Sequence, residues 1–328
     1  MACEWVDKIF EVKEEGFQAL ALEVFQFQYA ENEVYRKYVN ALHLDVAEIK
    51  SIEQIPFLPV RFFKTHKVIT TTFEPALIFE SSGTTETVNS RHFVKEPAIY
   101  FESYSKAFEL FYGSVMDYCI IGLLPVYLER TGSSLIYMVD DLIKKSNHSQ
   151  SGFYLNEFEE LNFLLKDLKN KNQKILLIGV TFALLDFAEK FQPDLSQSVI
   201  METGGMKGRR KEMIREDVHK VLQSAFNTDQ IHSEYGMTEL LSQAYSTGNG
   251  IFNCPSWMRV LLRDEEDPLS IRTGKTTSGA INIIDLANVY SCSFIATDDI
   301  GKRFEDGSFE VLGRMDGSDL RGCSLMVI

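Results

Sequence analysis

The sequence predicts an α/β protein with a largely parallel sheet and a smaller, antiparallel or barrel-like portion. Short apolar runs alternate with helical patterns along the first part of the chain, to about residue 250. After Gly250, short strands follow one another, separated by glycine, aspartate and charged turns. With 328 residues, 45% of them hydrophobic, the chain can bury a large core and lies at the upper end of what one domain holds. We expect one large domain at 1–312, with subdomains at about 1–250 and 251–312, and a hinge-like tail at 313–328.

The first elements are predicted from hydrophobic periodicity. From Phe17 to Leu42, apolar residues recur at steps of three, four and seven, which indicates one or two helices that pack on a core. The segment 55–64 contains two prolines, so it is predicted to be extended, and it leads into a strand at 76–80. Later apolar runs predict strands of the parallel part at 118–124, 174–180, 198–201 and 230–232.

A helix is predicted between the last two of these strands. Its apolar residues fall on one helical face and are Ile214, Val218, Val221, Leu222 and Ala225. Strands of the β-rich portion are predicted at 258–262, 279–285, 293–297 and 308–312. Their short lengths and the turns between them favour antiparallel or barrel-like pairing.

Composition narrows the class of partner and the compartment. The formal net charge is −14 and the isoelectric point is near 5.0, which argues against a nucleic acid or an anionic membrane surface as the main partner. The five cysteines are odd in number and widely scattered, so neither a disulfide framework nor a zinc site is indicated. No signal peptide or membrane-spanning stretch is recognisable, and we expect the protein in the reducing cytoplasm.

The most informative motif is a loop of small hydroxyl residues directly after the strand at 76–80. Its residues are Ser81, Ser82, Gly83, Thr84 and Thr85. Flexible backbone N–H groups and short O–H donors can wrap phosphate oxygens, since no bulky side chain stands in the way. For this stretch taken alone, a surface turn rich in serine and threonine is the alternative.

Two later motifs strengthen the phosphate interpretation. The hydroxyl loop is followed, in a fixed order, by Tyr235-Gly236-Met237-Thr238-Glu239 and then by Gly313-Arg314-Met315-Asp316. Together the three motifs resemble the nucleotide-binding motifs of the adenylate-forming enzymes. That resemblance implies a site for ATP with Mg²⁺ as cofactor.

The resemblance assigns a role to each residue of the second motif. Tyr235, with the small Gly236 beside it, faces the adenine ring. The Thr238 hydroxyl reaches the α-phosphate, and the Glu239 carboxylate holds Mg²⁺, which prefers oxygen ligands. Taken alone, a polar loop after a strand is the alternative.

The remaining parts of ATP are assigned in the same way. Gly204 and Gly205 let the backbone approach the adenine ring closely, because glycine carries no side chain. Asp299, which follows Thr297-Asp298, offers a carboxylate to the ribose hydroxyls, and Arg314 neutralises the phosphate of an acyl-adenylate. The alternatives are a strand-to-helix turn, an Asp-Asp turn and a solvated surface arginine.

The C-terminal sequence narrows the resemblance further. From about Ile55 to the end, the chain is similar to acyl-protein synthetases of the LuxE type, and Cys323, between Gly322 and Ser324, best matches their acyl-accepting cysteine. The resemblance implies ATP-dependent formation of acyl-AMP from a carboxylic acid, which we expect to be a fatty acid as in that family, and transfer of the acyl group to the Cys323 thiol. It also implies an acyl reductase or acyl carrier protein as partner, and the absence of the C-terminal lid domain that most adenylate-forming enzymes carry.

Two positions depart from the pattern of the superfamily. Its phosphate loop usually continues with a glycine and then a lysine, where this chain has Glu86 and Asn89. Arg91 is the candidate for replacing the missing cation. Two alternatives stay open: an AMP-forming acyl-CoA or aryl-CoA ligase that uses free CoA, and a non-catalytic nucleotide-binding relative.

Overall fold

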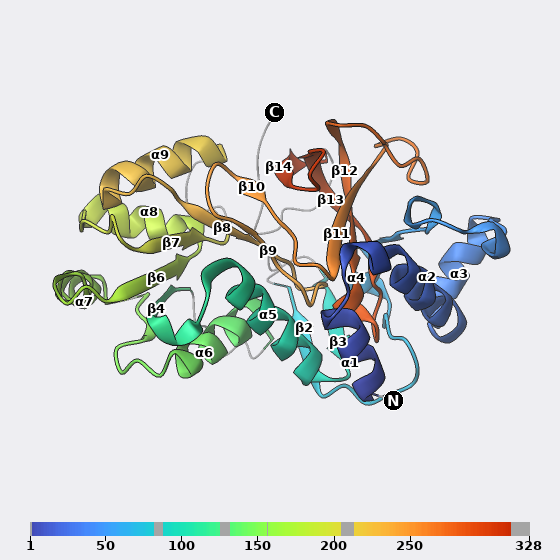
Figure 1. Cartoon of the computed structure of the whole chain (residues 1–328), viewed down its shortest axis with the longest axis horizontal. Coiled ribbons are helices and arrows are strands. Elements are labelled where there is room, and N and C mark those ends of the chain that lie inside the picture. Colours follow the sequence, from blue (N-terminus) through green and yellow to red (C-terminus); the bar gives the residue numbers. More distant parts are fainter. Residues whose placement is uncertain (1, 82–87, 125–131, 156, 205–212, 316–328) are drawn as a thin grey trace. The chain divides into compact units, whose positions relative to one another are not determined.

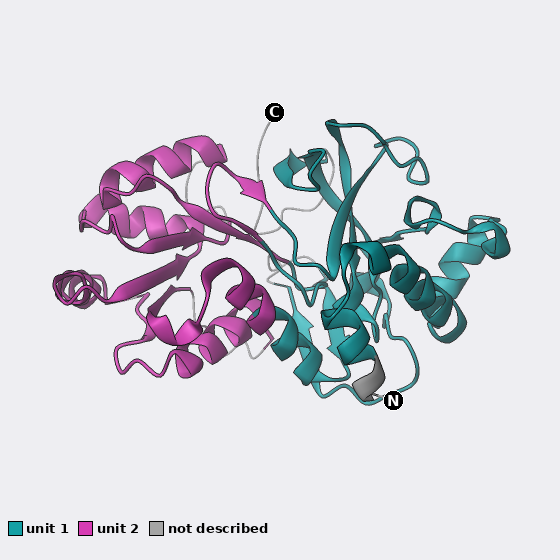
Figure 2. Ribbon diagram, in the orientation of Figure 1, with its two compact units in different colours: residues 1–104, 237–244, 253–318 teal, residues 105–236, 245–252, 319–328 magenta. Residues whose placement is uncertain are grey.

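The computed structural model describes residues 2–81, 88–124, 132–155, 157–204 and 213–315. They form two compact units (Figures 1 and 2). Unit 1 contains the described residues of Met1–Tyr104, Met237–Ala244 and Asn253–Ser318, and unit 2 contains those of Ser105–Gly236 and Tyr245–Phe252. Unit 1 holds a mainly antiparallel sheet and unit 2 a mainly parallel one, so both predicted kinds of sheet are present.

Unit 1 begins with three helices, α1 (Ala2–Phe10), α2 (Glu14–Glu31) and α3 (Glu33–Ala41). The helical pattern from 17 to 42 therefore forms two helices, α2 and α3. Asn32 separates them, because its backbone is extended and its side chain accepts the N–H of Tyr35 at 3.0 Å, which caps α3. The buried Gln28 of α2 donates to the carbonyl oxygens of Asn288 and Val289, each at 3.0 Å. These bonds attach α2 to a connection of the antiparallel sheet.

Short elements follow: η1 (Val46–Glu48), η2 (Ile52–Gln54), β1 (Leu58–Pro59), α4 (Phe62–Thr65), β2 (Leu77–Glu80) and β3 (Arg91–Val94). The segment predicted to be extended at 55–64 contains β1, but its last residues are helical, which corrects that prediction. The chain turns at Val60 and buries Phe63, whose N–H donates to the Val60 oxygen at 3.1 Å. The strand predicted at 76–80 is confirmed as β2, which pairs antiparallel with β3.

The antiparallel sheet of unit 1 confirms the predicted β-rich portion. Its strands are β11 (Met258–Arg263), β12 (Thr277–Asp285), β13 (Phe294–Arg303) and β14 (Phe309–Arg314). They lie side by side in the order β14, β13, β12, β11, and β1 pairs in parallel with β13. After β12 the chain forms the short helix η4 (Leu286–Asn288). β13 continues from the predicted end at Thr297 to Arg303, because it keeps pairing with β14 past a register shift at Gly301.

Unit 2 contains the predicted parallel sheet, in the order β5, β4, β6, β7, β8, β9. The bounds are β4 (Tyr118–Leu123), β5 (Gly152–Phe153), β6 (Lys174–Gly179), β7 (Val199–Glu202), β8 (His232–Tyr235) and β9 (Ala244–Ser246). β4, β6, β7 and β8 run parallel to one another. All six residues of β4 are buried, as is typical of a parallel strand covered on both faces.

Helices flank this sheet. They are α6 (Ser134–Ser146), α7 (Phe158–Asn170), α8 (Thr181–Lys190) and α9 (Arg215–Phe226). In Figure 1, α8 and α9 lie on one side of the sheet and α6 on the other. The preceding α5 (Pro97–Tyr112) contains residues of both units, and η3 (Val115–Asp117) and β10 (Ile251–Phe252) complete unit 2.

The strands predicted at 118–124, 174–180 and 198–201 are confirmed as β4, β6 and β7, but the next one is displaced. The predicted strand at 230–232 overlaps β8 only at His232. Asn227 ends α9 in the left-handed conformation, with a φ of 51°. The Thr228 hydroxyl then donates to the Gln230 carbonyl at 3.3 Å. These residues therefore form a turn, and β8 begins after it.

The two units divide the chain differently from the subdomains expected at 1–250 and 251–312. The N-terminal helices share a unit with the antiparallel sheet, since α2 and β1 bond to it. Of the tail expected at 313–328, Gly313 and Arg314 belong to β14. Within the described ranges of the chain, no helix combines the length and the apolar character needed to cross a membrane.

Candidate active site

The hydroxyl loop begins where β2 and β3 diverge in unit 1. The two strands pair up to Glu80 and Arg91. Beyond this pair, the N–H of Ser81 donates to the Ser90 oxygen at 3.0 Å, and the N–H of Ser90 donates to the Ser81 hydroxyl at 2.9 Å. Two hydrogen bonds therefore close the base of the loop. The other predicted residues of the loop lie outside the described residues: Ser82, Gly83, Thr84 and Thr85.

Arg91, the candidate replacement for the loop lysine, is the first residue of β3. Its side chain is exposed, and its guanidinium carbon lies 5.7 Å from the centroid of the Phe93 ring. A cation at this distance is attracted by the negative face of an aromatic ring. Arg91 thus carries a positive charge next to the base of the hydroxyl loop.

The motif at 235–239 begins at the end of β8. Tyr235 is buried in unit 2, where its ring centroid lies 5.9 Å from that of Phe252 in an edge-to-face arrangement. Gly236 follows, and the chain continues in unit 1 with a turn at Thr238 and Glu239. The Glu239 side chain is completely buried. A carboxylate in such a position is stable only with hydrogen-bond donors or a cation beside it.

Two buried side chains that the sequence did not single out support this turn. His92 Nδ1 lies 2.9 Å from the Thr238 carbonyl oxygen, and Asn288 Nδ2 donates to the Glu239 carbonyl oxygen at 2.8 Å. His92 belongs to β3 and Asn288 to η4. The turn is therefore held by two separate elements of unit 1.

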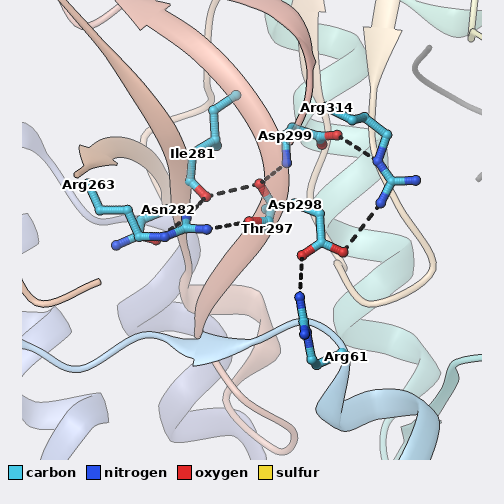
Figure 3. A network of polar contacts seen from close by, with 8 residues as sticks. All are labelled: Arg61, Arg263, Ile281, Asn282, Thr297, Asp298, Asp299 and Arg314. Carbon is cyan, nitrogen blue, oxygen red and sulfur yellow. Dashed lines mark hydrogen bonds and ion pairs between the residues drawn. The ribbon is translucent and has the colours of Figure 1, made fainter. Parts of the chain in front are cut away.

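Asp299 and Arg314 meet across two neighbouring strands of unit 1, as Figure 3 shows. They are direct partners in the register of β13 and β14, and Arg314 Nε lies 3.7 Å from Asp299 Oδ1. Arg314 Nη2 lies 3.3 Å from Asp298 Oδ2, and Asp298 Oδ1 also faces Arg61 at 3.7 Å. The Arg314 side chain is only 6% exposed, so water screens these ion pairs poorly. The predicted phosphate clamp and the predicted ribose anchor thus lie together.

Thr297 fixes the backbone of Asp299. The Thr297 hydroxyl accepts the N–H of Asp299 at 3.1 Å and donates to the Ile281 oxygen at 2.9 Å. The buried Arg263 donates to the Thr297 and Ile281 carbonyl oxygens at 2.6 and 2.8 Å (Figure 3). The Thr297 hydroxyl thus ties β13 to β12 and Arg263 ties both strands to β11, so Asp299 is held at a defined place on the sheet.

Glu202 connects the strand ends of unit 2. It is the last residue of β7, and its buried carboxylate accepts hydrogen bonds from the Thr181 hydroxyl at 2.8 Å and the Gly204 N–H at 2.9 Å. The Ser233 hydroxyl donates to it at 3.3 Å, and Arg215 Nε faces it at 3.4 Å. Thr181 follows β6 and Ser233 belongs to β8, so one carboxylate ties together the carboxyl ends of three parallel strands. In open α/β sheets, ligands bind outside this edge.

Glu202 and Glu234, both in unit 2, have pKa values shifted in opposite directions. Burial raises the pKa of the Glu202 carboxyl, but the hydrogen bond from His219 and the charge of Arg215 outweigh it and lower the pKa to about 2. Burial and the negative charge of Glu202 raise the pKa of Glu234 to about 8. At neutral pH, Glu202 is therefore ionised and Glu234 is largely protonated.

Gly204 is the described member of the predicted glycine pair, and Gly205 lies outside the described residues. The φ of Gly204 is 73°, in the left-handed region that glycine adopts without strain. The bond from its N–H to Glu202 stabilises this turn. Sequence reasoning missed Glu202, although a charged residue at the end of an apolar strand and two positions before a glycine pair was a usable signal.

The structure does not describe every predicted site residue. Cys323, the predicted acyl acceptor, lies outside the described residues, as does Glu86 of the departing loop. In the described part of the chain, no group of three or more His, Cys, Asp or Glu side chains is arranged to hold a metal ion.

Comparison with known structures confirms the predicted α/β fold. A 2-hydroxyisobutyryl-CoA ligase in the postadenylation state is similar with a TM-score of 0.67 at 12% identity, over 94% of this chain and 69% of that one. MatB from Rhodopseudomonas palustris with bound ATP is similar with a TM-score of 0.54 at 16% identity, over 74% of this chain. The likeness spans about half of MatB, 49% of its length.

Sequence comparison identifies the family. A long-chain-fatty-acid–luciferin-component ligase from Aliivibrio fischeri is 24% identical over 348 residues, which cover 96% of this chain and 89% of that protein. The model of the family described as acyl-protein synthetase, LuxE, matches residues 3–328. The match begins well before Ile55, where the sequence resemblance was expected to begin. Because it covers nearly the whole sequence, the chain belongs to the acyl-protein synthetase family, LuxE.

Proposed function

We propose that this protein activates a fatty acid with ATP and then transfers the acyl group to the thiol of its own Cys323. From there the acyl group passes to an acyl reductase or an acyl carrier protein. The observation that carries the proposal is the family match over residues 3–328, since the family is described as acyl-protein synthetase. The name of the Aliivibrio fischeri relative, a long-chain-fatty-acid ligase, supports a fatty acid as the substrate class.

In unit 1, the residues assigned to ATP are those for the phosphates and the ribose. The loop from Ser81 to Thr85 and the exposed Arg91 are assigned to the β- and γ-phosphates, where N–H, O–H and guanidinium groups can donate. Asp299 is assigned to the ribose hydroxyls and Arg314 to the α-phosphate. Their ion pair at 3.7 Å supports this assignment, because it holds both groups ready on neighbouring strands.

In unit 2, Tyr235, Gly236 and Gly204 are assigned to adenine. Tyr235 ends β8 and Gly204 follows the end of β7, and these two strands are parallel neighbours. The Glu202 carboxylate, which bonds to both Gly204 and β8, supports the assignment by fixing the two strand ends against each other.

The chemistry of the Glu239 side chain is compatible with the ligands that Mg²⁺ takes beside a nucleotide. Mg²⁺ that accompanies a nucleotide takes one or two carboxylates, water and phosphate oxygens rather than a complete cage of protein ligands. The buried Glu239 carboxylate can supply one such oxygen ligand. When bound, the ion neutralises charge on the phosphates.

The reaction has two steps. In the first, a carboxylate oxygen of the acid attacks the α-phosphorus of ATP, a new O–P bond forms, and the bond to the β-phosphate oxygen breaks to release pyrophosphate. In the second, the Cys323 thiol gives its proton to the solvent and the thiolate sulfur attacks the acyl carbon. A C–S bond forms, the bond to the AMP oxygen breaks, and AMP leaves. The resulting thioester is a good acyl donor to a partner protein.

The test is a pair of assays over fatty acids of different chain length and aryl acids. Acid-dependent exchange of labelled pyrophosphate into ATP reports the first step, and hydroxylamine-sensitive labelling of the protein by radioactive acid reports the second. Exchange and protein labelling with fatty acids, without CoA, are expected. Labelling of free CoA alone would assign a CoA ligase. ATP binding without exchange for any acid would assign a non-catalytic nucleotide-binding protein.

A further inference from the structure

Two consecutive carbonyl groups of the 235–239 motif, those of Thr238 and Glu239, each contact a buried side chain of unit 1. His92 bonds to the carbonyl oxygen of Thr238 and Asn288 to that of Glu239. His92 is 1% exposed and Asn288 is 0% exposed, so water does not compete for either bond. A buried carbonyl that loses its donor pays the full cost of desolvation. The conformation of this turn therefore depends on both side chains.

The chemistry of the first bond fixes the state of His92. A carbonyl oxygen only accepts, so Nδ1 of His92 carries the proton. Burial lowers the pKa of His92 to about 4, which leaves the ring neutral at physiological pH. The other nitrogen, Nε2, then carries a lone pair, and it has no hydrogen-bond partner within the described structure.

The buried Nε2 of His92, which has no hydrogen-bond partner among the described residues, carries an energetic cost that needs an explanation. The His92 ring packs edge-on against Phe63 and Phe79, with centroid distances of 5.8 and 6.5 Å. In such surroundings an apolar side chain of similar size would avoid the cost of burying a lone pair without a donor. Among the described contacts of this ring, the N–H donated to Thr238 is one that an apolar residue could not provide.

The bond also joins two motifs that lie far apart in the sequence. His92 follows Arg91 in β3, the strand that leaves the hydroxyl loop, and it pairs with Phe79 of β2. Its partner Thr238 is 146 positions away. One imidazole thus connects the hairpin that carries the hydroxyl loop to the turn that carries Thr238 and Glu239.

We propose that His92 and Asn288 are positioning residues for ATP with Mg²⁺, which fix the turn of Thr238 and Glu239 against β3 and η4 of unit 1. The inference rests on the proposed function, in which both motifs contact the phosphates. Each side chain acts through a backbone carbonyl of the turn. Loss of either bond is expected to displace the two side chains of the turn, Thr238 and Glu239, at once.

The decisive variants differ in the donor at position 92. His92→Leu removes the N–H, whereas His92→Asn keeps an amide N–H close to the place of Nδ1. His92→Leu is expected to raise the KM for Mg-ATP about tenfold, the scale of one lost buried hydrogen bond, with the KM for the acid unchanged. His92→Asn should restore most of the affinity, and Asn288→Ala should act in the same direction as His92→Leu.

A matched control is Tyr35→Phe. The Tyr35 side chain is also completely buried in unit 1, and its hydroxyl donates to the backbone oxygen of Pro56 at 2.6 Å, away from the motif. This variant loses the same kind of bond and should keep the KM for Mg-ATP of the wild type. An equal rise in both variants, or no rise in His92→Leu, would overturn the proposal.

A measurement on the wild type covers the case in which His92→Leu does not fold. NMR of the imidazole nitrogens, with the signal of His92 assigned by its loss in His92→Asn, should show the Nδ1–H tautomer at neutral pH. The Nε2–H tautomer would overturn the inference. If the wild type catalyses no acid-dependent exchange, the proposed function fails, while the tautomer and the calorimetric affinity of these variants for Mg-ATP still decide the role of His92.

Discussion

Arg314 shows how a single residue can be prepared for a ligand. Its guanidinium group faces Asp298 and Asp299 at 3.3 and 3.7 Å, and Asp298 also faces Arg61. The guanidinium is a planar fork with five N–H donors, so it can keep one carboxylate while another edge turns to a phosphate. A lysine has one point of charge and cannot be oriented by two carboxylates in this way. The two aspartates therefore set the direction of the Arg314 side chain, the proposed phosphate clamp.

The assignment of Glu239 to Mg²⁺ can be tested by replacing its carboxylate with an amide. Glu239→Gln keeps the size of the buried side chain but removes its negative charge. Adenylate formation should fall by roughly two to three orders of magnitude, the usual scale for losing one electrostatic contact to developing charge. Acid-dependent pyrophosphate exchange measures the effect, with the thermal unfolding curve as the control for folding. Exchange at the wild-type rate and the wild-type magnesium requirement would remove Glu239 from the site.

Gly204 permits a test that separates backbone strain from function. Its φ of 73° is matched by Gly113, whose φ is 78° and which has open space around the position of a β-carbon. Alanine at either place should cost about 1–2 kcal/mol of unfolding free energy, because an L side chain is strained in this conformation. Only Gly204→Ala should also weaken ATP binding, measured by calorimetry. Equal ATP affinity in the two variants would argue against an adenine contact at Gly204.

At the scale of elements, the ends of β6, β7 and β8 depend on the charge of Glu202. The Glu202 carboxylate accepts hydrogen bonds from Thr181 after β6, from Gly204 after β7 and from Ser233 in β8. The pKa of Glu202 is lowered to about 2. A group whose pKa is lowered in the folded state stabilises the fold above its unfolded pKa, and the contribution is lost as the pH falls through the folded value. The Glu202 contribution should therefore disappear between about pH 4.5 and pH 2.

Glu234 should act in the opposite direction. Because its pKa is raised to about 8, its contribution is complete below about pH 4.5 and is lost as the pH rises toward 8. Glu234→Gln mimics the protonated form, so its melting temperature should fall less than that of the wild type between neutral and mildly alkaline pH. The control is Glu216→Gln, an exposed change on α9 of the same unit. If the melting temperatures of the wild type and of Glu234→Gln fall equally over this pH range, the raised pKa of Glu234 is contradicted.

The elements that the sequence predicted well are those with a strong local pattern. β4 and β6 are continuous apolar runs, because both faces of a parallel strand are covered, and their limits agree closely with the prediction. β8 was displaced because its pattern is short and the preceding turn contains Ile231, a buried apolar residue outside the strand. The helical turn of α4 was missed because the prolines dominate the local pattern.

The candidate site residues were proposed from motifs, whereas the contacts between them could not be predicted from the sequence. The motif residues Asp299 and Arg314 could be found from their order in the chain, but their pairing depends on the register of β13 with β14, including a shift at Gly301. The bond between His92 and Thr238 joins residues 146 positions apart, and no local pattern marks such a partner. Supporting residues of this kind require the folded chain to be recognised.

At the scale of the whole molecule, the family match and the fold cover more of the chain than the motifs do. The motifs begin at Ser81, whereas the family match begins at residue 3. Two parts of this earlier segment contact the β-rich portion of unit 1: Gln28 of α2 bonds to the connection between β12 and β13, and β1 pairs with β13, which carries Asp299. The N-terminal segment is therefore a part of the unit that carries Asp299, and changes in it should reach the sheet through those contacts.

The last prediction separates the two proposed steps of the reaction. Adenylation needs no thiol, whereas storage of the acyl group on the protein does. Cys323→Ser should keep acid-dependent pyrophosphate exchange near the wild-type rate and abolish covalent labelling by radioactive acid and ATP, since a hydroxyl group has a much higher pKa and is a far poorer nucleophile at neutral pH. Neutral hydroxylamine should release the label from the wild type, as it does from a thioester. Labelling that persists in Cys323→Ser would exclude this cysteine as the acceptor. If the wild-type protein takes up no label but acylates free CoA, the assigned activity would be that of a CoA ligase.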